Sequence, residues 1–181
     1  MQRLQEKYHK VIVPKLIEEV GLSNALEAPR LSKIIVHMSL GRVQGNKEEI
    51  EKATQDLTVI TGQKPVVTRA KKAIAGFKLK QGDKIGAKVT LRGARMWDFA
   101  DKLFTIVLPR TRDFQGLPQN GFDRAGNYTF GINEQGVFME IDANKLDKAR
   151  GMQITLVAKG STSAPLVQRL FKDLGLPLQK D

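Results

Sequence analysis

The chain has 181 residues, of which 41% are hydrophobic and 27% charged, and this composition is typical of a folded globular protein. It contains no cysteine, which excludes disulfides and thiolate metal sites and is typical of a reducing cytoplasm. The net charge of +11 favours a polyanionic partner, nucleic acid before an acidic membrane surface. The N-terminal residues MQRLQEKYHK lack the apolar core of a secretory signal, and no apolar run approaches the ~18 residues of a membrane span. We therefore expect a cytoplasmic protein with no membrane partner.

In the first part of the chain, apolar spacing predicts a helix over residues 3–20, a strand over Lys33–Leu40 and a helix from Asn46 to Ile60. Pro14 either kinks or divides the first helix, whose buried face would be formed by Leu4, Tyr8, Val11, Ile12, Leu16 and Val20. Asn46 and Glu49 have the spacing of a capping pair for the second helix. The apolar stripe of this helix would be formed by Ile50, Ala53, Leu57 and Ile60.

In the rest of the chain, two strands are expected at Pro65–Arg69 and Gly86–Arg92, followed by a helix over Ala94–Leu108. Short strands at Tyr128–Ile132, Val137–Ile141 and Met152–Ala158 come next, and Ser163 is expected to cap a final helix that has Pro165 near its first turn. These elements predict a single α+β domain over residues 1–181. Its antiparallel sheet would have helices packed on one face, a basic opposite face and one long basic loop.

The stretch from Gly62 to Arg95 contains ten Lys or Arg residues and one acid, a net charge of +9. Ordinary surfaces mix the two signs, and ordinary hairpin loops have about two to five residues, whereas the loop here spans about residues 70–85. Both features favour phosphate binding over a merely solvated surface. Phe77, among the lysines, either stacks on a ligand or folds back onto Ile74 or Leu79.

Side chains in the second strand of this hairpin alternate in character. Ala87, Val89 and Leu91 point to one side, and Lys88, Thr90 and Arg92 to the other. If helices cover the apolar side, the polar side becomes a platform on which phosphates dock.

A second long loop spans about residues 111–127 and is rich in Gly, Pro, Asn and Asp. Aromatic and arginine residues lie in or beside it: Arg110, Arg112, Arg124, Phe114, Phe122 and Tyr128. The aromatic side chains either contact RNA or protein, or anchor the loop to the core; the sequence leaves both possibilities open.

Enzyme signatures are missing. The chain has two histidines, no carboxylates paired at ligand spacing, no phosphate-binding glycine motif and no nucleophile placed beside a base. Ser161 and Ser163 lie where a helix cap is expected. We therefore expect no enzymatic activity, no metal and no cofactor. The residues alone leave three possibilities open, namely a structural RNA-binding protein, another nucleic-acid module such as an RNA chaperone or nucleoid protein, and an enzyme acting on RNA.

Four segments carry a resemblance to a known family: GQKPVVTRAKKAIAGFKLKQGDKIGAKVTLRGARMW, LPRTRDFQGL, GFDRAGNYTFGINEQ and GMQITLVA. They resemble the bacterial large-subunit ribosomal proteins called "L five", in register over nearly the whole chain. The resemblance implies a structural protein that attaches 5S rRNA in the central protuberance. It also implies contacts with 23S rRNA, the P-site tRNA, neighbouring central-protuberance proteins and a head protein of the small subunit.

The resemblance also implies roles for individual residues. Those expected at 5S rRNA are His37, Gln63, Lys64, Thr68, Arg69, Lys88, Thr90 and Arg92. The tRNA-contacting loop would use Lys71, Lys72, Gly76, Phe77, Lys78 and Lys80. The intersubunit bridge would use Arg110, Arg112, Asp113, Asp142 and Lys145.

Two positions depart from the family pattern. His37 stands where the family has an Asn beside its RNA-facing Gln and Thr, and a neutral imidazole there either donates one hydrogen bond to RNA or simply faces solvent. Family members read F-D-G-R-G-N where this chain reads Phe122 to Asn127 as F-D-R-A-G-N. The resemblance therefore does not define the detailed backbone of that loop.

Overall fold

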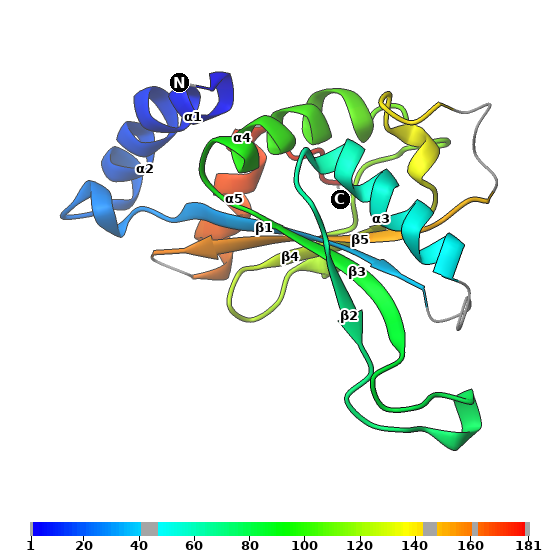
Figure 1. Ribbon diagram of the computed structural model, residues 1–181. Helices are drawn as coiled ribbons and strands as arrows, with labels where there is room; N and C mark the ends of the chain where they lie inside the picture. The colour runs from blue at the N-terminus through cyan, green and yellow to red at the C-terminus, as the bar shows by residue number, and fades with distance from the viewer. Residues whose placement is uncertain (1, 41–46, 143–147, 161–162, 180–181) are drawn as a thin grey trace. The chain divides into compact units, whose positions relative to one another are not determined.

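The structure is a computed structural model that describes residues 2–40, 47–142, 148–160 and 163–179. Its five-stranded antiparallel sheet has the strand order β2-β3-β1-β5-β4, which confirms the predicted α+β class (Figure 1). The strands are β1 (Arg30–Ser39), β2 (Val66–Arg69), β3 (Lys84–Leu91), β4 (Tyr128–Ile132) and β5 (Met152–Lys159). The α-helices are α1 (Arg3–Lys7), α2 (Val13–Val20), α3 (Lys47–Thr61), α4 (Gly93–Lys102) and α5 (Ala164–Leu174).

The chain divides into two compact units. The first unit comprises residues 1–34, 91–130 and 155–181, and the second comprises residues 35–90 and 131–154. The division falls within β1, β3, β4 and β5, so each of these strands contributes residues to both units.

The first helical segment continues past Pro14 instead of breaking there. A π-helical turn over Tyr8–Ile12 joins α1 to α2, with the Val13 N–H donating to the carbonyl of Tyr8. Pro14 has no N–H and would clash with a carbonyl one turn earlier, so a locally wider helix accommodates it. Leu4, Tyr8, Ile12 and Leu16 are buried, whereas Val11 and Val20, also predicted for the buried face, are exposed.

The other helices of the first unit follow the prediction with two differences. The helix that begins as α4 continues as a π-helical turn over Leu103–Val107. In this turn the Leu108 N–H donates to the carbonyl of Leu103, five residues earlier. Ser163 is the N-cap residue of α5, as predicted, but its side chain makes no capping hydrogen bond. Instead its backbone carbonyl accepts from the N–H groups of Leu166 and Val167.

In the second unit, α3 presents one buried stripe formed by Ile50, Ala53, Leu57 and Ile60, as predicted. Asn46, the expected capping residue, lies outside the described residues. The strands bury alternate side chains, including Val36, Met38 and Val89. The hairpin formed by β2 and β3 continues past these strands into the basic loop (Figure 1).

The strand predicted at Val137–Ile141 is wrong. Residues Gln135–Val137 form a short 3-10 turn, and no strand is assigned between β4 and β5 in the described part of the chain. Val137 and Phe138 are both buried while Met139 and Glu140 are both exposed, so the segment lacks the alternating burial of a strand.

Candidate nucleic-acid interface

The two hairpin strands pair so that polar side chains gather on one side. Val66 lies opposite Lys88 and Thr68 opposite Gly86, and the register shifts between Thr68 and Arg69. In β3, Ala87, Val89 and Leu91 are buried, Lys88 is exposed and Thr90 is half-buried, so the strand alternates as predicted. Directly opposite residues of an antiparallel pair share a face. Thr68, Gly86 and Lys88 therefore lie on the side of the strands that is not packed into the core.

His37 and Thr68 meet over Gly86, and we call these three residues the Gly86 recess. A Cβ atom on Gly86 would lie 2.8 Å from the carbonyl oxygen of Met38, 2.9 Å from His37 Nε2 and 3.0 Å from Thr68 Oγ1. The imidazole therefore occupies space that only a glycine leaves free. Thr68 Oγ1 is buried and has no hydrogen-bond partner among the residues that the structure describes.

The environment of His37 keeps its imidazole neutral near pH 7. Burial lowers the pKa of His37 below its ordinary value, and the positive charge of Lys88 lowers it further. His37 is nevertheless half-buried rather than enclosed.

The end of α3 positions Gln63. Gly62 adopts a left-handed conformation with φ of 64° and ends the helix. The hydroxyl of Thr61 lies 2.6 Å from the carbonyl oxygen of Leu57 and 3.1 Å from that of Gln63. Gln63 Nε2 donates to the carbonyl of Thr90 at 3.3 Å, so the predicted Gln63 and Thr90 lie together beside the hairpin. Lys64 follows and is exposed.

The basic loop has a defined backbone of its own. Ile74 and Leu79 pair through two backbone hydrogen bonds of 2.9 and 3.1 Å, and residues Ala75–Phe77 form a 3-10 turn between them. Asp83, the one acid of the stretch, accepts from the backbone N–H of Lys80 at 2.8 Å. Its carboxylate therefore stabilises the loop backbone.

The tip of the basic loop is open to solvent. Lys71, Lys72, Gly76, Phe77, Lys78 and Lys80, the six residues expected at tRNA, are all exposed. The Phe77 side chain is 73% exposed, so it does not fold back onto Ile74 or Leu79. An exposed aromatic ring among lysines is available for stacking.

The second long loop is anchored through its aromatic residues. The ring centroid of Phe122 lies 4.4 Å from that of Tyr128 and 6.1 Å from that of Phe171. The Tyr128 hydroxyl donates to the carbonyl of Pro118 at 2.7 Å, and burial raises the pKa of Tyr128 to about 12. For these aromatic residues, anchoring to the core is therefore the correct alternative.

Asp123 organises the turn in which this chain departs from the family pattern. Its Oδ1 accepts from the backbone N–H groups of Ala125 and Asn127, and its Oδ2 accepts from Asn127 Nδ2 at 2.8 Å. The side-chain hydrogen bond from Asn127 is the main reason that the pKa of Asp123 is lowered. Gly126, the residue before Asn127, adopts a left-handed conformation with φ of 78°.

The remaining predicted residues are dispersed. Arg92 is exposed, is the N-cap residue of α4 and belongs to the first unit. Arg110 and Arg112 are exposed, and Arg112 pairs with the exposed Asp113 at 3.6 Å. Asp142 is also exposed, and Lys145 lies outside the described residues.

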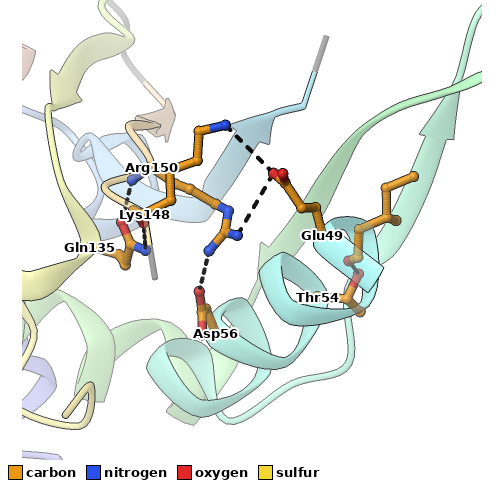
Figure 2. Close-up of polar contacts among 7 residues, drawn as sticks. Glu49, Thr54, Asp56, Gln135, Lys148 and Arg150 are labelled. Carbon is orange, nitrogen blue, oxygen red and sulfur yellow. Dashed lines mark hydrogen bonds and ion pairs between the residues drawn. The ribbon is translucent and has the colours of Figure 1, made fainter. Parts of the chain in front are cut away.

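Sequence analysis missed an ionic cluster in the second unit, formed by Glu49, Asp56, Lys148 and Arg150 (Figure 2). The Arg150 side chain is only 8% exposed, and its guanidinium lies 3.4 Å from Asp56 and 3.9 Å from Glu49. No local sequence motif predicts this cluster, because Asp56 and Arg150 are 94 positions apart in the sequence.

Gln135 fixes the backbone from which the two cations of the cluster extend. Its Nε2 donates to the carbonyl of Lys148 at 2.9 Å and its Oε1 accepts from the backbone N–H of Arg150 (Figure 2). The Gln135 side chain is completely buried, and these two hydrogen bonds satisfy both of its polar atoms.

Within the described residues, no group of three or more His, Asp or Glu side chains is arranged to hold a metal ion. None of the helices described is long and apolar enough to cross a membrane.

Comparison with known proteins identifies the family. Residues 24–80 match the family described as "Ribosomal protein L5", and residues 84–178 match the model of the C-terminal part of the same ribosomal family. The chain is 49% identical over 180 residues to the large ribosomal subunit protein uL5 of a Thermoanaerobacter species, covering 99% of this chain and 100% of the relative. It is 49% identical over 177 residues to uL5 of Clostridium beijerinckii, covering 98% of each. Because these matches extend over almost the entire sequence, the chain belongs to the ribosomal protein L5 family.

Proposed function

We propose that this protein is a structural constituent of the large ribosomal subunit and that it binds 5S rRNA through the exposed side of β1, β2 and β3 in the second unit. Membership of a family of ribosomal proteins supports a ribosome-bound, cytoplasmic and non-enzymatic role. The observation that carries the 5S rRNA assignment is the gathering of His37, Thr68 and Lys88 on one side of the strands.

The chemistry of this surface suits folded RNA. Lys64, Arg69 and Lys88 supply positive charge for phosphates. Gln63, Thr68 and Thr90 supply neutral donors and acceptors, which match 2′-hydroxyl groups and base edges. Base-paired RNA is recognised largely by its shape and by phosphate and 2′-hydroxyl contacts, and a platform of this kind provides such contacts without an inserted helix. Arg92, the N-cap residue of α4, adds a further cation for phosphate.

The basic loop has a separate role in this proposal. Its lysines and the exposed Phe77 contact the P-site tRNA, whose backbone and bases offer phosphates and stacking surfaces. Lysines of the basic loop also contact 23S rRNA in this proposal. Neighbouring central-protuberance proteins contact other parts of the chain.

The intersubunit contact belongs to a different part of the chain. Arg110, Arg112, Asp113 and Asp142 are exposed and charged, and in this proposal they face a head protein of the small subunit. Lys145 is assigned to the same contact by family resemblance.

Substitutions separate the two RNA-binding roles. We expect Thr90→Ala and Arg92→Ala each to weaken binding of isolated 5S rRNA, with about tenfold loss for Arg92→Ala, because a hydrogen bond from a charged donor contributes about 1.5 kcal/mol or more. Phe77→Ala leaves this affinity unchanged and weakens tRNA contacts in assembled ribosomes. If Phe77→Ala abolished 5S rRNA binding, the division of roles between strands and loop would be wrong.

A further inference from the structure

The Gly86 recess contains two polar groups that are not hydrogen-bonded to each other. His37 Nε2 and Thr68 Oγ1 lie 2.9 and 3.0 Å from the same point, the position of an added Cβ on Gly86. Thr68 Oγ1 is buried, and in the described part of the chain it has no hydrogen-bond partner. A neutral imidazole has one N–H and the imidazolium has two, so only protonated His37 can donate to Thr68 and to a second acceptor at the same time.

Within the described residues, the charged group that acts on His37 is the cationic Lys88 of strand β3. Strand β2 contributes Thr68, which is uncharged and lies opposite Gly86. Arg69 and Lys84 form the next pair along the hairpin. The residues of β5 in this unit, Met152–Ile154, carry no charge. Within the described residues the imidazole therefore has cations nearby and no carboxylate that would favour its protonation.

We propose that docking of an RNA phosphate on this surface is coupled to the uptake of one proton by His37, so that RNA affinity rises as pH falls. The inference rests on the proposed function, because it assumes that RNA occupies this side of the strands. A phosphate beside Lys88 replaces the unfavourable cationic surroundings with an anion, which favours the imidazolium. The imidazolium then donates one N–H to Thr68 and presents the other to a phosphate oxygen.

The size of the effect follows from linkage. If one proton is taken up on binding, affinity changes by at most about tenfold per pH unit, within the interval between the pKa of His37 in the free protein and its higher pKa in the complex. The free protein has a pKa below 6.5, so the change is expected as pH falls through about 7 towards 6.

The chain contains a matched control, because it has only two histidines and the other, His9, is exposed on the first helical segment. The affinity of the full chain for isolated 5S rRNA is measured from about pH 8 to about pH 6 at constant ionic strength. We expect the native protein and His9→Asn to bind more tightly at low pH, and His37→Asn and His37→Gln to bind with a flat profile. The N-terminal amine titrates equally in all four proteins and cancels in the comparison.

Calorimetry in two buffers of different ionisation enthalpy gives a second readout that requires no variant. We expect the native complex to take up between half a proton and about one proton near pH 6.5. A flat native profile, or an unchanged slope in His37→Asn, would overturn the coupling while leaving 5S rRNA binding intact. Absence of native 5S rRNA binding at every pH would instead refute the proposed function, and with it this inference.

Discussion

Gly86 determines how closely three strands bring their polar groups together. A Cβ at this position would lie 2.8 Å from a backbone oxygen of Met38, closer than real Cβ atoms come, as well as against His37 and Thr68. Backbone atoms in a sheet move less easily than the end of a side chain, so the strands themselves would have to shift.

We therefore expect Gly86→Ala to lower the free energy of unfolding by about 1–3 kcal/mol, the usual cost of overpacking. Gly76 provides the control, because a Cβ there meets nothing within 4 Å and its φ is not positive. Gly76→Ala should change stability by less than about 1 kcal/mol. Urea denaturation of both variants tests this, and equal stabilities would show that the recess is not tightly packed.

His37 also affects the stability of the free protein. Burial, with help from Lys88, lowers its pKa in the folded state below the unfolded value of about 6.5. As pH falls through that range the unfolded chain binds the proton first, so stability decreases with falling pH. We expect this decrease to be smaller in His37→Asn than in the native protein, as measured by thermal unfolding at successive pH values. An equally steep decrease in both proteins would contradict the pKa direction.

At the scale of elements, the Arg150 cluster joins α3 to the segment that leads into β5. Arg150 is nearly buried, and Glu49 and Asp56 are each about three-quarters covered, with exposed fractions of 26% and 23%. Removing the guanidinium would leave these two carboxylates without their buried cation.

We expect Arg150→Met to destabilise the protein by about 2 kcal/mol, below the full cost of breaking a buried pair because both acids retain some solvent contact. Lys148 contacts the same Glu49 but is 57% exposed. Lys148→Met should therefore cost less than about 1 kcal/mol. Chemical denaturation distinguishes the two variants, and a loss for Lys148→Met as large as that for Arg150→Met would contradict the importance of burial.

Local patterns predicted most elements but not the contacts between distant ones. The apolar stripe of α3 and the alternation of Ala87, Val89 and Leu91 are periodic in the sequence and were predicted from it. The strand at Val137–Ile141 was predicted wrongly, because its apolar and polar residues come in pairs and a buried glutamine just before them fixes a turn. The Gly86 recess and the Arg150 cluster were missed, because no local signal links His37 with Gly86, or Asp56 with Arg150, which are 94 positions apart.

At the scale of the whole molecule, charge is concentrated where the interface is proposed. The stretch from Gly62 to Arg95 carries a net +9 of the chain's +11. Such a concentration favours a polyanion but does not identify one. Family membership supports the ribosome, and the family resemblance implies the particular RNAs. The structure groups His37, Thr68 and Lys88 on one side of the strands, which supports the proposed RNA surface.

The most direct test of the central claim is the affinity of the full chain for isolated 5S rRNA as a function of salt, with random duplex DNA as competitor. If six to ten phosphates are contacted, affinity should fall roughly 10³- to 10⁵-fold between about 50 and 200 mM salt, provided that duplex-DNA behaviour transfers to RNA. We predict that 5S rRNA retains its advantage over duplex DNA throughout this range. A flat salt dependence, or equal binding of the two nucleic acids, would contradict specific 5S rRNA recognition by a basic surface.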